Sequence, residues 1–515
     1  MKKRSMIAIL LASVLLISAF TGCGMTQQLT QAVNGIADGG AVEYYAVPAE
    51  TEPEWNTEEY KYQKENSFQS VAANPFATFA ADVDTASYSN FRRQVVKGQK
   101  VQPDSVRVEE FINYFQYDYP EPQGDEPFAV TLEVAPCPWN EQTQLLSIGL
   151  QAKKLNAEEL PRSNLVFLID VSGSMYSENK LPLVQRSFLT LAENLDQNDR
   201  VSIVTYSSGE KIVLDGVNGS EHQKIAAAIE GLQADGSTRG DKAIEMAYEL
   251  AERYYIEGGI NRVIMATDGD FNVGVTSEGD LTRLIQKKAQ KGVFLSVLGY
   301  GMGNYKDSKL ESMADNGNGN YAYIDSVDEA RRVLVNEAGG TLFTVAKDVK
   351  LQVEFNPAAI KGYRLIGYEN RVMSAEDFSD DTKDGGEIGA GHQVTALFEI
   401  VPVDSEFEIP EVDSKYGKTE TGSEFADELC TLNIRYKEPE GSESTLKTYP
   451  VTRDVQRETM SDNLRWAAGV AEAAMLLKGS AYKGASTYAS AKDLLTPAAT
   501  DDFRTEFLEL LNKIG

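Results

Sequence analysis

Four short apolar segments in the middle of the chain constrain its fold most strongly. They are residues 165–169, 201–204, 262–265 and 293–298. Nearly continuous apolar runs of this length are typical of strands that are buried on both faces of a sheet. Between them, apolar residues recur at helical spacing, as over residues 181–191. The alternation predicts a parallel sheet covered by helices on both sides, with residues 211–214 as an antiparallel edge strand.

Strands are also expected on both sides of this central region. Upstream, residues 128–135 and 145–151 have the pattern of two antiparallel strands, which are too few to bury a face by themselves. The downstream strands are expected at residues 349–355, 363–368, 393–401, 429–436 and 444–451. We therefore predict that upstream and downstream strands form one β-rich domain, into which the central module is inserted.

Helical flanks complete the predicted architecture. Apolar residues recur at helical spacing over residues 88–115 and 464–511, and we expect these flanks to pack together. The predicted fold is α/β: a doubly wound, mostly parallel sheet inserted in a β-rich domain, with small helical flanking segments. The expected units are a signal peptide (1–22), a lipidated flexible linker (23–74), a helical segment with two strands of the β-rich domain (75–160), the central module (163–338), the remaining β-rich domain (339–455) and a C-terminal helical segment (456–515).

The segment Asp170-Val171-Ser172-Gly173-Ser174 stands where the first buried strand ends. In open α/β sheets, ligands bind beyond the carboxyl ends of the strands, at the point where the strand order reverses. Asp170 can present a carboxylate there. Gly173 permits a tight turn, so Ser172 and Ser174 can direct both hydroxyls to the same point. These three side chains are candidate metal ligands.

Two later loops are expected at the same edge of the sheet. Thr238 precedes a helical pattern, and Asp268 follows the strand that begins at Arg262. The five candidates offer only oxygen, the ligand that Mg²⁺ prefers, and no nitrogen or thiolate that would favour zinc. Each residue alone could be an ordinary turn or capping residue. Together they predict a site for Mg²⁺, with Mn²⁺ or Ca²⁺ as alternatives.

The pattern Asp170-x-Ser172-x-Ser174, followed by Thr238 and Asp268, resembles the metal-ion-dependent adhesion site of von Willebrand factor type A domains. The resemblance covers roughly residues 163–338. It implies that the two aspartates act largely through water, that the three hydroxyls coordinate the cation, and that one metal position is left for an acidic residue of a partner protein.

A small-molecule cofactor is not expected. Gly299, Gly301 and Gly303 follow a strand, but their spacing is G-x-G-x-G and not that of the dinucleotide fingerprint. A flexible loop is the better interpretation. The acidic segment 376–381 has the composition of a calcium loop, but an acidic surface loop is the more common reason for such a run.

The N-terminus has the features of a signal peptide. Lys2, Lys3 and Arg4 precede an apolar run over residues 6–20, which is shorter than a membrane-spanning helix requires. The run ends in Phe20-Thr21-Gly22-Cys23, which resembles the lipobox of bacterial lipoproteins, although Leu usually stands where this chain has Phe20. We therefore expect lipidation of Cys23 and an extracytoplasmic protein anchored to the bacterial membrane or envelope.

The net charge of the chain limits the classes of partner that it can bind. A formal net charge of −29, from 78 acidic and 49 basic residues, excludes a protein built to bind nucleic acid phosphates. The segment from Gly24 to about Asn74 lacks apolar periodicity and is acidic with proline, which is typical of a flexible tether.

The two remaining cysteines, Cys137 and Cys430, lie on opposite sides of the central module. A disulfide between them and two separate buried thiols are both compatible with the sequence. The balance between these two alternatives depends on whether the flanking segments share one domain.

Catalytic motifs are not found. His222 and His392 are isolated, and neither a metalloprotease, a nucleophile-elbow nor a phosphate-loop pattern occurs. The segments 74–79 and 82–88, together with the lipid signal, central module and β-rich tail, are similar to a family of bacterial type A lipoproteins. We therefore expect a membrane-tethered, metal-dependent protein-binding module and not an enzyme. A hydrolase or an assembly scaffold, in which the module only recruits substrates or partners, are the alternatives.

Overall fold

The part of the chain that the computed structural model describes begins at Glu58. It comprises residues 58–155, 161–238, 240–269, 278–303, 305–337, 340, 342–409, 425–439 and 441–515. The expected signal peptide and Cys23 lie outside these residues. Among the helices of the described part, none is both long and apolar enough to span a membrane.

Residues 58–74 differ from the flexible linker expected to extend to Asn74. The carboxylate of Glu58 accepts hydrogen bonds from both terminal nitrogens of Arg93, at 2.7 and 2.9 Å. Strand β1 (Gln69–Ser70) pairs antiparallel with β12 (Ile360–Ile366). The polar composition that predicted a tether is retained, but long-range pairing orders this segment, and composition alone does not reveal such pairing.

The central region forms a six-stranded sheet in the order β10-β9-β8-β5-β6-β7. Neighbouring strands are parallel except for β7, which pairs antiparallel with β6 as the predicted edge strand. The strands are β5 (Ser163–Asp170), β6 (Arg200–Tyr206), β7 (Glu210–Asn218), β8 (Ile260–Thr267), β9 (Phe294–Gly299) and β10 (Tyr321–Tyr323).

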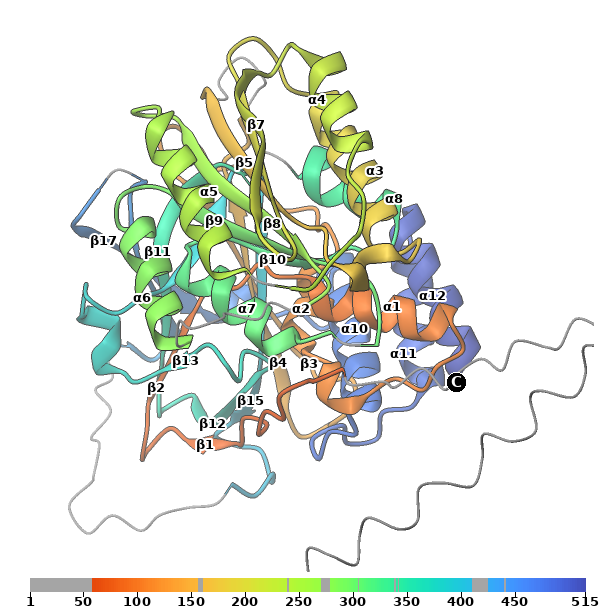
Figure 1. The fold of residues 1–515 in the computed structure, drawn as a ribbon. Coiled ribbons are helices and arrows are strands. Elements are labelled where there is room, and N and C mark those ends of the chain that lie inside the picture. Colours follow the sequence, from red (N-terminus) through yellow and green to blue (C-terminus); the bar gives the residue numbers. More distant parts are fainter. Residues whose placement is uncertain are drawn as a thin grey trace, which may run out of the picture. The chain divides into compact units, whose positions relative to one another are not determined.

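Helices cover both faces of this sheet, as the alternating pattern predicted. Leu165, Phe167 and Ile169 of β5 belong to the hydrophobic core beneath the first group of helices, and Val166 and Leu168 belong to the core on the opposite face. The first group contains α3 (Leu181–Ala192), α4 (His222–Glu230) and α8 (Val327–Arg331). The second contains α5 (Asp241–Arg253), α6 (Glu278–Ala289) and α7 (Asp307–Asn316). Figure 1 shows α3 and α4 on one side of the sheet and α5 and α6 on the other.

Two antiparallel sheets form the β-rich domain, in the orders β1-β12-β15-β4-β3 and β13-β2-β11-β16-β17, with β14 beside β11. They share one core, in which the ring of Phe79 lies 5.9 Å from that of Phe398. The strands are β2 (Phe76–Ala80), β3 (Phe128–Pro136), β4 (Gln144–Ala152), β11 (Thr344–Phe355), β13 (Val372–Met373), β14 (Gly386–Gly389), β15 (Gln393–Pro402), β16 (Glu428–Lys437) and β17 (Ser444–Thr452). Since β4 pairs with β15, the central module is inserted into this domain.

The two helical flanks pack together, as expected. The ring of Phe115, just after α2, meets Trp466 of α10 edge to face at 5.0 Å. The ring of Phe91 of α1 approaches Phe507 of α12 at 6.0 Å. The helices are α1 (Ala86–Val96), α2 (Val108–Asn113), α10 (Asp462–Lys478), α11 (Tyr488–Leu495) and α12 (Asp502–Ile514), which cluster at one side of Figure 1.

Cys137 and Cys430 do not form a disulfide. Both are buried, free thiols. Cys137 packs in the core of the helical flanks, whereas Cys430 packs in the core between the two antiparallel sheets. Of the two alternatives, the structure has the separate buried thiols. Sharing a domain does not by itself bring two side chains within the short distance that a disulfide requires.

Candidate metal centre

Asp170 is the last residue of β5, at the point where the order of the central sheet reverses. The chain passes from β5 to β6 on one side, and β8 lies on the other. The side chain of Asp170 is completely buried. Its Oδ1 accepts a hydrogen bond from the backbone N–H of Ser172 at 2.9 Å, and its Oδ2 accepts one from the Thr267 hydroxyl at 3.3 Å. These bonds hold the carboxylate at the carboxyl edge of the sheet.

The two serine hydroxyls of the motif converge beside this carboxylate. The Oγ atoms of Ser172 and Ser174 lie 3.1 Å apart. Ser174 lies in a short 3₁₀ turn (Gly173–Tyr176), and Ser172 immediately precedes it. Ser172 is buried, whereas Ser174 is exposed. Adjacent oxygen ligands of an octahedral Mg²⁺ with bonds of about 2.1 Å lie about 3.0 Å apart. The spacing of the two hydroxyls therefore fits neighbouring positions on one cation.

The loop that carries Thr238 lies against the same turn. The N–H of Gly173 donates to the carbonyl of Gly236 at 2.9 Å, and the N–H of Asp235 donates to the carbonyl of Val171 at 2.8 Å. Gly236 has a φ of +80°, which favours glycine. Thr238, two residues further on, is partly buried. The structure thus brings together the first and second loops that the sequence analysis combined.

Asp268 follows the neighbouring strand β8 and is buried beside the same edge, with 1% of its surface exposed. The N–H of Gly269 donates to the Thr267 hydroxyl at 3.2 Å, and that hydroxyl in turn donates to Asp170. A chain of hydrogen bonds therefore links the loop of Asp268 to the first aspartate. All five predicted ligands come to the carboxyl ends of β5 and β8 and the adjoining loop.

Burial raises the pKa of Asp170 to about 7. The negative charge of Asp268 adds to this rise, and the hydrogen bonds from Ser172 oppose it. A divalent cation at this edge would favour the ionised carboxylate, because it supplies the positive charge that the buried position lacks. The donor set, composed of oxygen atoms alone, fits a hard cation such as Mg²⁺.

Lys180 is a charged residue at this edge that the sequence pattern did not single out. Its Nζ lies 2.8 Å from Oδ2 of Asp268, and its side chain is 10% exposed. It lies ten positions after Asp170 and immediately before α3, at a spacing that matches no ligand motif. The close approach to Asp268 arises only from the folding of β8 beside β5.

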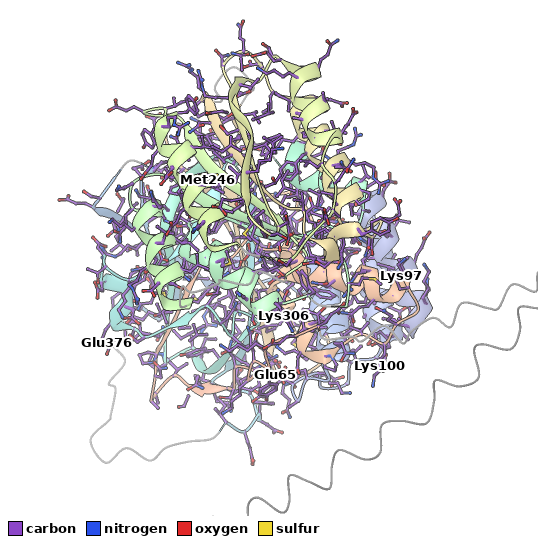
Figure 2. The ribbon with its side chains drawn as sticks, viewed as in Figure 1. Glu65, Lys97, Lys100, Met246, Lys306 and Glu376 are labelled. Atoms are coloured by element: carbon purple, nitrogen blue, oxygen red, sulfur yellow. The ribbon has the colours of Figure 1, made fainter. Side chains whose placement is uncertain are left out.

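The acidic segment 376–381 forms a surface loop in the structure. Glu376 and its neighbours form a short 3₁₀ turn (Glu376–Ser379), and Glu376 is exposed and points away from the body of the protein in Figure 2. Lys350 donates to the backbone carbonyls of Asp377 and Asp380 at 3.2 and 2.6 Å. The segment is therefore an acidic surface loop that is held in place by hydrogen bonds from Lys350.

The segment 82–88 joins parts of the chain that are far apart in sequence. Arg371 donates through Nε to Asp82 at 2.9 Å and through a terminal nitrogen to Asp84 at 3.2 Å and Asp315 of α7 at 2.9 Å. The other oxygen of Asp84 accepts from the N–H of Tyr321 in β10 at 2.9 Å. We call Asp82, Asp84, Asp315 and Arg371 the arginine-held cluster; it connects the inserted module to the β-rich domain.

Three family models match the chain. The model described as von Willebrand factor type A domain covers residues 164–335, the one described as von Willebrand factor covers residues 54–147, and the one described as the C-terminal part of uncharacterized protein YfbK covers residues 340–515. The first coincides with the inserted module, and the other two cover segments on either side of it.

The chain is also similar to individual proteins, of which the first shows its family. The chain is 42% identical over 465 residues to uncharacterized protein YfbK of Escherichia coli, covering 88% of this chain and 80% of that protein. It is 27% identical over 188 residues to the Synechocystis protein sll0103, covering 36% and 43% of the two chains. A solved von Willebrand factor type A structure from Catenulispora acidiphila is 16% identical, with a TM-score of 0.43, and covers 78% and 91%. The chain therefore belongs to the YfbK family and contains a von Willebrand factor type A domain.

Proposed function

We propose that this protein binds a partner protein through a divalent cation held at the carboxyl edge of the inserted module. The observation that carries the proposal is the convergence of oxygen donors there, above all the 3.1 Å separation of the Ser172 and Ser174 hydroxyls beside the buried Asp170. Ser174 is exposed, so this edge is open to a second molecule.

In this proposal, five residues of the chain hold the cation, and the partner protein supplies one further metal ligand. Ser172, Ser174 and Thr238 would hold the cation through their hydroxyls, and Asp170 and Asp268 would do so largely through water. A bound cation would supply a positive charge and an open coordination position. An aspartate or glutamate of the partner protein is the side chain best suited to that position, because hard cations prefer carboxylate oxygen.

We propose binding and not catalysis as the role of this site. His222, at the start of α4, donates a hydrogen bond through Nε2 to the backbone carbonyl of Leu195 at 2.8 Å. Burial lowers the pKa of His392 to about 4, and the charges of Arg332 and Arg262 add to the decrease. His392 is therefore neutral at ordinary pH, and both histidines have surroundings that account for them structurally.

The location is proposed from the sequence alone. We propose that lipidation of Cys23 anchors the protein outside the cytoplasm, at the membrane or envelope of a bacterial cell, where the cation site would meet other envelope proteins. Mass spectrometry of the purified chain tests this step: a thioether-linked lipid on Cys23 supports it, and an unmodified Cys23 contradicts it.

Calorimetric titration of the purified full chain with Mg²⁺ and with Mn²⁺ tests the metal site directly. We expect one site per chain, and we expect Asp170→Ala to abolish it. The matched control is Asp215→Ala in the same module, which removes an exposed ion pair with Arg253, 3.0 Å apart, and leaves metal binding unchanged.

Capture of the partner is tested with the same variants. Envelope proteins retained by the immobilised chain in Mg²⁺ should be released by EDTA and should not be retained by Asp170→Ala. Retention by Asp215→Ala shows that the loss is specific. Capture that is insensitive to both EDTA and Asp170→Ala would overturn the metal-dependent model.

A further inference from the structure

Lys180 places a buried ammonium group against a predicted metal ligand. The residue is 8% exposed, and its Nζ lies 2.8 Å from Oδ2 of Asp268, which is 1% exposed. A lysine is almost never buried to this extent unless its charge is paired. The ion pair is therefore a buried interaction at the carboxyl edge of the sheet and not a surface contact.

The loop after β9 leaves space for the lysine side chain. Gly301 has a φ of +79°, and a Cβ atom placed on it would lie 2.5 Å from Cε and 2.6 Å from Cγ of Lys180. The hydroxyl of Tyr323 donates to the carbonyl of Gly301 and fixes this loop. One glycine of the G-x-G-x-G segment is thus explained by the path of Lys180 to Asp268.

An ammonium group in this position opposes a divalent cation in two ways. It occupies one oxygen of Asp268, so the carboxylate must share its charge between lysine and metal. It also repels the cation, and such repulsion is strong where water is largely excluded. In the absence of metal, the same ammonium offsets the negative charges of Asp170 and Asp268 and so stabilises the module.

We propose that Lys180 is an internal competitor for the metal, which lowers the divalent-cation affinity of the site and stabilises the module when it is free of metal. The inference rests on the proposed function, since it concerns the affinity of that same site. It makes Lys180 a positioning residue that acts on the cation through Asp268.

Two neutral variants separate the charge of Lys180 from its bulk and from its hydrogen bond. Lys180→Met keeps the length of the side chain, and Lys180→Gln keeps a donor for Asp268. We expect both to bind Mg²⁺ about tenfold more tightly than the wild type, a change of about 1.4 kcal/mol. Lys180→Arg retains the charge and should stay within about threefold of the wild type, on the scale of a small local rearrangement.

Thermal unfolding in EDTA gives the second readout. The neutral variants should unfold at a lower temperature than the wild type when metal is absent, although they bind Mg²⁺ more tightly. Opposite changes in stability and affinity are not expected from a merely structural defect, which would lower both. The control is Lys154→Met, which removes an exposed ion pair with Glu121, 2.7 Å apart, and should change neither quantity.

The outcomes distinguish this inference from the proposed function. If the wild type binds Mg²⁺ and the folded neutral variants bind it no more tightly, the competitor role of Lys180 is overturned and the metal site stands. If the folded wild type and the neutral variants all fail to bind Mg²⁺ and Mn²⁺, the proposed function itself is overturned. Because Lys180→Met and Lys180→Gln differ in shape, a folding defect in one leaves the other to decide.

Discussion

The negative charges of two carboxylate clusters in this protein are offset in different ways. In the arginine-held cluster, one guanidinium binds Asp82, Asp84 and Asp315 at distances of 2.9 to 3.2 Å. At the carboxyl edge of the inserted module, Asp170 and Asp268 lie beside hydroxyl-bearing residues, among them Ser172 and Thr267, and the ammonium of Lys180 pairs with Asp268.

The difference fits a stabilising role for the first cluster and the metal binding that we propose for the second. A guanidinium offers five donors in a fixed plane and can satisfy several carboxylates at once, which suits a permanent connection between domains. Hydroxyl groups carry no charge and do not neutralise the carboxylates of the module edge. A bound cation would therefore stabilise these carboxylates. The exposed Ser174 opens that edge to solvent, whereas the arginine-held cluster ties together α7, β10 and the segment 82–84.

Removal of the guanidinium should give the largest effect. Arg371→Met leaves the buried Asp82 and Asp84 and the partly exposed Asp315 without their shared cation. We expect the free energy of unfolding to fall by about 3 kcal/mol, measured by urea denaturation. The control is Arg253→Met, which removes an exposed ion pair and should cost less than about 1 kcal/mol. Equal effects of the two substitutions would contradict the assigned role of the cluster.

Mg²⁺ should act on one group of carboxylates and not on the other. At a concentration one hundred times its dissociation constant, Mg²⁺ should stabilise the wild type by about 2.7 kcal/mol, seen as a rise in melting temperature. Asp170→Asn should lose this rise and Asp84→Asn should keep it. If the rise disappeared in Asp84→Asn but persisted in Asp170→Asn, the metal would bind at the arginine-held cluster, which would contradict the proposed site.

The smallest expected effect concerns a carboxyl group next to the arginine-held cluster. Burial raises the pKa of Glu109 to about 8, the charge of Glu369 adds to the rise, and Lys478 opposes it. Above the ordinary glutamate value of 4.5, the unfolded chain has released this proton, whereas the folded chain retains it until about pH 8. Glu109 therefore lowers stability progressively as the pH rises through this window.

Glu109→Gln should remove this pH dependence. We expect the melting temperature to rise by roughly 2 °C at pH 8.5 and to change little at pH 4.5, measured by thermal unfolding across the pH range. Glu329 provides a control of opposite sign: against the effect of burial, Arg332 and Arg92 lower its pKa to about 2. Glu329 contributes stability above pH 4.5 that is lost as the pH falls, so Glu329→Gln should destabilise at neutral pH. A Glu109→Gln variant that loses stability at pH 8.5 would contradict the raised pKa.

Much of the fold follows from local patterns in the sequence. The continuous apolar runs of β5, β6, β8 and β9 specify strands buried on both faces, and the strand pattern predicted β3 and β4 together with their pairing. Strand β2 and helix α7 were not predicted. Strand β2 is the short segment Phe76–Ala80, and α7 has many polar residues, so neither has a strong periodic signal.

One physical cause explains two features that the sequence did not predict: the order of residues 58–74 and the separation of the two cysteines. Residues 58–74 have the composition of a tether, yet Glu58 is paired with Arg93, and β1 extends a sheet through β12. Cys137 and Cys430 are in adjoining regions, yet they pack in different cores. Both features concern long-range contacts, whose partners are set by the arrangement of whole elements and not by neighbouring residues.

The sequence by itself determined the inserted α/β module and the five oxygen-bearing residues of its candidate metal site. These depend on strand periodicity and on loops that follow strand ends, which are local properties. Only the tertiary structure placed Lys180 against Asp268 and Arg371 among Asp82, Asp84 and Asp315. These groups come from separate elements, and their charges interact only once the folded chain excludes water and brings them within a few ångströms.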